Sequence, residues 1–300
     1  MTDGSWSKLR TPAALQAAAL AVLLCLGLPA LGQSTPSSQT PPKQSAPAAP
    51  SQAPAAAPGQ QAAPAPPQPA VNKEEEDAYK AFYELTTQQN TELVTQGEAF
   101  LAKFPDSRYR SSVYARLMNA YLSTNQPARL VTVGEKALAE NPDNVDVLAI
   151  ICTIIPRTVD PRSLDADQKF SEAERYARHA IELINRMQMP EGKTPEQFEQ
   201  AKAQMLGFAH YGLGLVNYMR GNTAGSVDEL EQATKLDPQP EPLEFYLLGS
   251  GDFKLKKFSE AAAAFDRCAT AQWAPQWQAR CKKGEADAKQ AAAPPASAKP

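Results

Sequence analysis

The chain has 300 residues, with 30 Lys or Arg against 33 Asp or Glu, a formal net charge of −3. Acidic and basic residues are nearly balanced, and no cluster of basic residues stands out. The charge therefore gives no support to nucleic-acid binding or to a polybasic membrane contact. The length allows one or two domains.

Residues 1–32 have the pattern of a secretory signal peptide. Two basic residues among the first ten precede an apolar run over residues 13–28, and Ala30 and Gly32 supply a small-residue cleavage site. We therefore expect cleavage after Gly32 and an exported protein of the periplasm or cell envelope. The alternative is an uncleaved anchor, because residues 12–31 are just long enough to span a bilayer. Membrane association is expected only in that case.

Residues 33–72 are almost wholly Pro, Ala, Gln and Ser, and up to Val71 the only charged residue is Lys43. This composition cannot bury enough apolar surface to fold, so it predicts a disordered linker. Its reach when extended is on the order of 120 Å, at about 3.1 Å per residue. It is either a passive spacer or a tether that carries the folded part through a cell-wall layer.

Residues 73–289 have helical periodicity throughout, which predicts an all-α domain. The apolar run over residues 145–155 is rich in β-branched side chains, yet it follows an Asn-Pro-Asp-Asn sequence that ends one helix and caps the next. We therefore expect a helix there too. Residues 290–300 are rich in Ala and Pro and are predicted to be a disordered tail.

The stretch over residues 213–238 indicates two helices joined by a tight turn. Gly214 on the first helix and Ser226 and Ala233 on the second are small where the helices must approach closely, and Leu230 supplies bulk between them. This spacing resembles a tetratricopeptide (TPR) repeat. One helix pair cannot bury its own apolar face, so one repeat implies several.

The resemblance covers about Glu74 to Lys289 and implies a TPR-like α-solenoid of about five helix pairs, closed by a capping helix from about Pro275. The sequence Phe-Pro-Asp-Ser-Arg-Tyr over residues 104–109 also resembles the TPR proteins of bacterial envelopes, including the barrel-assembly lipoprotein and the cell-division coordinator. The resemblance therefore implies an exported repeat protein of the bacterial-envelope type.

Two pairs depart from the repeat length. The third has a long connection, after which Ser171 and Glu174 predict a capping box that restarts its second helix. In the fourth, Thr194 and Gln197 predict a capping box with Pro195 at the first helical position. The first helix of the fourth pair is then about 25 residues long, two turns more than a repeat needs.

No catalytic or metal-binding constellation is found, so we expect no enzyme activity and no cofactor. His179 is expected on a solvated face. His210 and Asn217 lie on the stripe that faces the second helix of the fourth pair. Buried polar groups need partners, so hydrogen bonds are expected for both, with a ligand-binding or pH-sensing role for His210 as the alternative.

The part of the chain after the signal contains three cysteines, Cys152, Cys268 and Cys281. All three fall at small positions of the repeat register, where cysteine acts as a compact apolar residue. The alternative for two of them is a Cys268–Cys281 disulfide, permitted by export, that fastens the capping helix to the last repeat.

The resemblance implies a row of side chains facing the concave surface. This partner-binding row consists of Phe208, Tyr211, Leu215, Tyr218 and Met219 in the fourth pair, Tyr246 and Phe253 in the fifth, and Asn119 in the second. Its aromatic character favours an apolar peptide or helix as ligand. A helix that is apolar on two faces is either buried on both sides or awaits a partner. The alternative occupants are other segments of this chain.

Two functions follow as hypotheses. The first is a non-enzymatic scaffold of the cell envelope that binds another envelope protein in the concave groove. The second is a structural component of outer-membrane assembly or cell-division coordination, acting through the length of its tether and through oligomerisation.

Overall fold

The computed structural model describes residues 72–271 and 275–293, and these residues form eleven helices and no strand. The predicted signal peptide, the predicted linker up to Val71 and residues 294–300 lie outside the described residues. None of the described helices is both long and apolar enough to cross a membrane.

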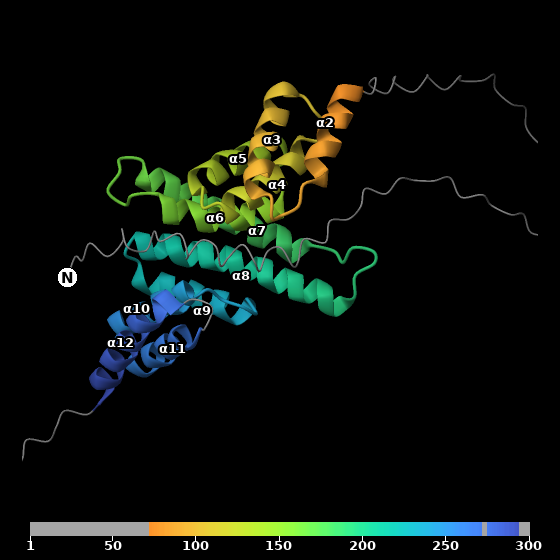
Figure 1. Ribbon diagram of the computed structural model, residues 1–300. Helices are drawn as coiled ribbons and strands as arrows, with labels where there is room; N and C mark the ends of the chain where they lie inside the picture. Colours follow the sequence, from red (N-terminus) through yellow and green to blue (C-terminus); the bar gives the residue numbers. More distant parts are fainter. Residues whose placement is uncertain (1–71, 272–274, 294–300) are drawn as a thin grey trace, which may run out of the picture.

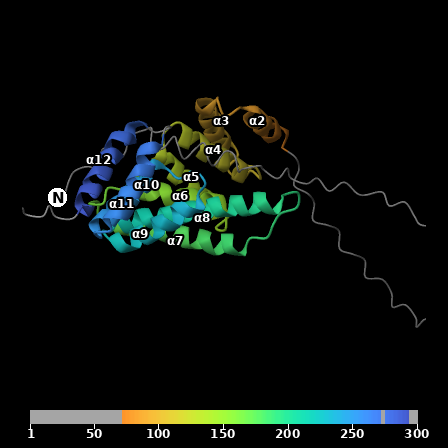
Figure 2. The same ribbon diagram turned by 90° about the horizontal axis from the view of Figure 1, so that it is seen from below.

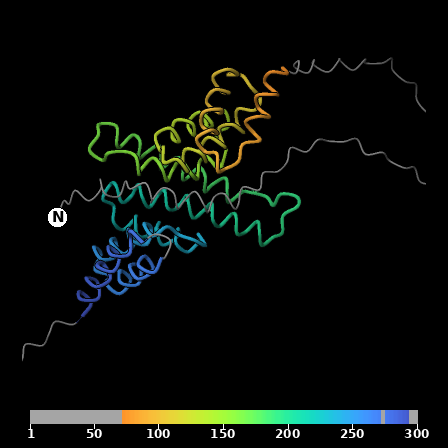
Figure 3. The backbone as a smooth tube through the Cα atoms, in the orientation of Figure 1, coloured from red at the N-terminus to blue at the C-terminus, as the bar shows by residue number. Residues whose placement is uncertain are grey.

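Ten of the helices form five consecutive antiparallel pairs. The pairs follow the chain order through space (Figures 1 and 3). The pairs are α2 (Lys73–Glu84) with α3 (Asn90–Lys103), α4 (Arg110–Ser123) with α5 (Pro127–Glu140), α6 (Val145–Thr158) with α7 (Ala166–Arg186), α8 (Pro195–Met219) with α9 (Thr223–Leu236), and α10 (Pro242–Lys254) with α11 (Phe258–Thr270). The last helix, α12 (Pro275–Ala292), packs on α11 and α10 and closes the array. The predicted all-α solenoid is confirmed, and α12 runs three residues beyond the predicted end at Lys289.

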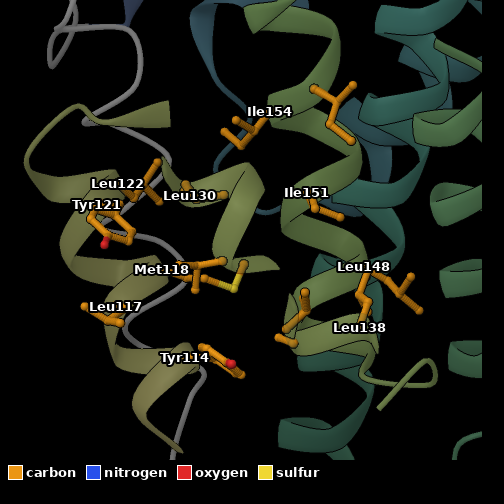
Figure 4. Packing of buried hydrophobic residues seen from close by; sticks show 14 of the residues in the cluster. Tyr114, Leu117, Met118, Tyr121, Leu122, Leu130, Leu138, Leu148, Ile151 and Ile154 are labelled. Atoms are coloured by element: carbon orange, nitrogen blue, oxygen red, sulfur yellow. The ribbon is translucent and has the colours of Figure 1, made fainter. Parts of the chain in front are cut away.

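The core is continuous between successive pairs. Figure 4 shows apolar side chains of α4, α5 and α6 meeting in one layer, with Leu117, Leu130 and Ile151 fully buried. Gly134 on α5 gives this layer room, because a Cβ there would lie 3.0 Å from Ile151 Cδ1. Close packing of this kind makes each pair depend on its neighbours for burial.

The fourth pair has the geometry that its sequence predicts. A Cβ on Gly214 would lie 2.8 Å from Leu230 Cγ, and Ser226 Oγ donates to the Gly214 carbonyl at 3.0 Å. Gly221 has a φ of 75° in the turn, and Asn222 caps α9 by accepting from Gly225 N at 3.2 Å. Small residues therefore lie where α8 and α9 touch.

The start of α8 is also as predicted. Thr194 Oγ1 accepts from Gln197 N at 3.3 Å, and the Gln197 side chain accepts from Thr194 N at 3.2 Å. The helix has 25 residues. Its N-terminal turns extend past the neighbouring helices, together with the loop from α7 (Figure 2).

The predicted capping box of the third pair is wrong. Ser171 lies inside α7, which begins at Ala166, and its hydroxyl donates to the Asp167 carbonyl at 2.8 Å. Ala166 and Phe170 are both buried, so the apolar stripe of the helix continues upstream of Ser171. Burial of that extra turn outweighs a local capping pattern.

One of the three cysteines is a buried free thiol, and the other two form a disulfide. Cys152 is free and fully buried on α6, as a compact apolar residue. Cys268 on α11 and Cys281 on α12 form a disulfide, with their Cα atoms 5.8 Å apart. The disulfide alternative is therefore correct for this pair.

Candidate protein-interaction surface

The predicted partner-binding row does not form one surface. Tyr211 and Leu215 are 2% and 0% exposed and pack in the core with Val227, Leu230 and Leu243. Neither side chain faces solvent in this structure. These two residues are therefore removed from the predicted site.

The burial arises because α8 is enclosed on more than one side. It packs against α6, α7 and α9, and every residue from 211 to 216 is buried. The helices approach closely at Gly212, where a Cβ would lie 2.7 Å from Cys152 Sγ and 3.1 Å from the Cys152 carbonyl oxygen. The apolar second face of this helix is thus explained by neighbouring repeats along its centre.

The remaining residues of the row lie at separate places. Phe208 borders a concavity of only about 20 Å³, room for roughly one water molecule. Met219 packs on the large N-terminal core, whereas Tyr218 and Tyr246 pack on the C-terminal one. Asn119 is half-buried on α4. Only the C-terminal members remain together.

A group of five side chains, here called the aromatic strip, comes from the end of α8, the length of α10 and the start of α12. It consists of Tyr218, Tyr246, Lys254, Trp277 and Arg280. The Lys254 ammonium lies 5.2 Å from the Tyr218 ring centre, and the Arg280 guanidinium lies 5.5 Å from that of Tyr246. The Tyr246 and Trp277 ring centres are 5.4 Å apart. Sequence reasoning found the two tyrosines and missed the other three residues.

The strip has a positive edge. Within the described residues, neither Lys254 nor Arg280 has a carboxylate within ion-pair distance, although Lys257 and Lys283 nearby in sequence do. Lys254 is exposed, and Tyr218, Tyr246 and Arg280 are half-buried. Trp277 is only 5% exposed, so it supports the Tyr246 ring and is not itself open to a partner. Burial raises the pKa of the Tyr218 hydroxyl, which therefore stays neutral. Cations over ring faces gain further when solvent is excluded by a partner.

Phe253 extends the apolar surface at the turn between α10 and α11. It is 36% exposed, and its ring meets that of Phe258 edge-on at 5.3 Å. Leu255 beside it is exposed to a similar degree. This tip is the second place where the predicted row reaches solvent.

The histidines are accounted for by local partners. His210 Nδ1 lies 2.7 Å from Glu229 Oε2 on α9, and Asn217 Nδ2 donates to the Leu213 carbonyl at 3.1 Å. The expected hydrogen bonds on this stripe are confirmed. His179 lies at the surface, 2.7 Å from Asp143 Oδ1. In the described part of the chain no group of His, Cys, Asp and Glu is arranged to hold a metal ion.

The helix pairs, the small residues between paired helices and the closing helix fit a TPR-type repeat protein.

No protein-family model and no curated protein matches the sequence. Among solved structures, the chain is similar to a thermophilic TPR protein from Thermus thermophilus, with 15% identity and a TM-score of 0.43. The match covers 72% of this chain and 99% of that one.

Proposed function

We propose that this protein is an exported, non-enzymatic scaffold that binds a segment of another cell-envelope protein along the aromatic strip. The observation that carries the proposal is the placing of Lys254 and Arg280 over Tyr218 and Tyr246 without carboxylate partners. Tyrosine, tryptophan and arginine are the residues that most often dominate the energy of protein interfaces.

The chemistry of the strip selects the kind of segment. Its ring faces offer apolar contact, and its two cations offer sites for carboxylates. A peptide in which apolar side chains alternate with Asp or Glu satisfies both, whereas a wholly apolar helix would bury the cations unpaired. This choice differs from the apolar ligand that the sequence favours, because Lys254 and Arg280 join the tyrosines only in the folded chain.

Export is supported by two independent features. The first is the signal-peptide pattern of residues 1–32. The second is the Cys268–Cys281 disulfide, a bond that persists in oxidising compartments such as the periplasm. An envelope partner follows from that location.

Site-directed photo-crosslinking tests the proposal. A photoreactive phenylalanine analogue at Tyr218 is expected to capture a specific envelope protein, whereas the same analogue at Tyr83, which is 52% exposed on α2, is the matched control. The captured protein is then purified and titrated against the wild type and a Tyr246→Ala/Lys254→Glu variant. We expect affinity to fall at least tenfold, for a loss of about 1.4 kcal/mol or more.

Equal affinity of the wild type and the variant would overturn the aromatic strip as the binding surface. Deleting residues 34–70 distinguishes this proposal from the second hypothesis, a structural role that depends on the length of the tether. Binding by the purified chain should persist if the strip binds the partner. Its loss on deletion would favour a role that depends on the tether.

A further inference from the structure

Helix α10 carries Tyr246 and Lys254 of the aromatic strip, and each of its ends is anchored by a buried carboxyl group. Glu244 in the first turn is 1% exposed, and Asp252 near the last turn is 2% exposed. Buried carboxyl groups are rare unless they are paired. Each has one oxygen, Glu244 Oε2 and Asp252 Oδ1, without a hydrogen-bond partner among the described residues.

The N-terminal anchor connects α10 to α6. Arg157 Nη1 lies 3.3 Å from Glu241 Oε1, and both side chains are only 8% exposed. Glu241 N donates to Glu244 Oε1 at 2.9 Å, which fixes the first turn of α10. Tyr211 from α8 and Asp237 from the end of α9 complete this buried cluster.

The cluster holds one guanidinium for three carboxyl groups. Burial, reinforced by the charges of Asp237 and Glu241 and opposed by Arg157, raises the pKa of Glu244 well above its usual range. Burial also raises the pKa of Asp237. In the packed state Glu244 is therefore a neutral acid, since a second or third negative charge here has no cation to balance it.

The C-terminal anchor has the same character. Burial raises the pKa of Asp252 to about 6, and Glu231 on α9 and Glu260 on α11 act in the same direction. The opposing charge is Lys257, whose Nζ is 4.0 Å from Asp252 Oδ1. The packed state thus favours a neutral carboxyl group at this end as well.

We infer that α10 is held in the array by neutral carboxyl groups at both ends, so that it is packed most firmly at low pH and loosens as the pH rises. This inference rests on the proposed function for its consequence, because loosening α10 displaces Tyr246 and Lys254 and so weakens partner binding. The site is then regulated by the pH of the compartment.

The sign follows from linkage. A carboxyl group whose pKa is higher in the folded than in the unfolded chain stabilises fully below its unfolded pKa. That contribution is lost as the pH rises through the folded pKa, which for Asp252 is about 6. Opening of α10 should therefore increase about tenfold per pH unit, between the unfolded and folded pKa values, for each group that ionises on opening.

Hydrogen exchange of the full chain between pH 4 and pH 9, corrected for the intrinsic pH dependence of exchange, tests the inference. Peptides covering residues 242–254 should lose protection with pH, while peptides from α4 keep theirs. Glu244→Gln preserves the oxygen that accepts from Glu241 N but carries no charge. Asp252→Asn removes the charge at the other end with little change of shape. The double variant should remove the rise, and Glu199→Gln, at an exposed site on α8, should not.

Unchanged protection of α10 relative to α4 in the wild type would overturn the inference, whether or not the variants fold. A double variant that opens with pH as the wild type does would also overturn it. Photo-crosslinking from Tyr218 at pH 5 tests the proposed function separately. If α10 loosens as expected while no partner is captured, the switch stands and the binding role fails.

Discussion

Helix α6 packs along the C-terminal half of the molecule, and two of its contacts there are opposite in character. At its middle, Cys152 meets Gly212 of α8 in an apolar contact without room for a methyl group. At its end, Arg157 enters a buried cluster of carboxyl groups at the start of α10. The contact at Cys152 should respond to a change of side-chain volume and not to a change of charge. The contact at Arg157 should respond to a change of charge. The apolar contact thus fixes the position of α8 against α6, and the polar cluster sets how the start of α10 responds to pH.

Removing the buried cation is expected to have the largest effect. Arg157→Met leaves Glu241 buried without its partner, and loss of one member of a buried ion pair costs about 4 kcal/mol. Urea unfolding at pH 7 measures the change. Arg175→Met, at an exposed position on α7, is the control and should cost less than about 1 kcal/mol. A double variant Arg157→Met/Glu241→Gln should recover much of the loss, and no recovery would show that Arg157 acts through shape alone.

Breaking the disulfide should have the next largest effect while leaving both contacts of α6 intact. Cys268→Ser with Cys281→Ser removes a link across 13 residues, worth about 3 kcal/mol for a loop of this size. Thermal unfolding with and without dithiothreitol measures it, since reductant should lower the Tm of the wild type and not of the variant. A wild-type Tm that is indifferent to reductant would contradict a bond in the folded protein.

Filling the apolar contact should have the smallest effect of the three. Gly212→Ala places a Cβ against Cys152, and forcing extra volume into a packed core costs about 2 kcal/mol. Ala263→Val, at an exposed position on α11, is the control. The loss should be the same at pH 5 and pH 8, because no charge is involved. A strongly pH-dependent loss would mean that the two contacts of α6 are not separable.

Local signals in the sequence correctly predicted the ends of those helices whose caps and turns are formed by neighbouring residues. Thr194 and Gln197 define the start of α8, and Gly221 and Asn222 define the turn into α9, because caps and turns depend on side chains a few residues apart. The prediction from local signals was wrong at Ser171, whose sequence pattern matches a helix cap. Ala166 and Phe170 extend the buried apolar stripe of α7 upstream of it, and burial of that stripe decides where the helix begins.

The candidate site was predicted less well than the fold. The repeat register places Tyr211 and Tyr218 in one row, but the folded array buries Tyr211 and leaves Tyr218 half-exposed. The partners that give the aromatic strip its charge, Lys254 and Arg280, come from two other helices. A periodic pattern states which face a residue occupies and does not state what covers that face.

The sequence by itself determined the all-α repeat architecture, the paired helices and the close approach at Gly214, because periodicity, caps and small residues act over one or two helices. The tertiary structure alone decided the burial of Tyr211 and Leu215, the Cys268–Cys281 bond and the cluster around Arg157. Arg157 and Glu241 are 84 residues apart, and their charges are coupled only because the folded array brings them together and excludes water.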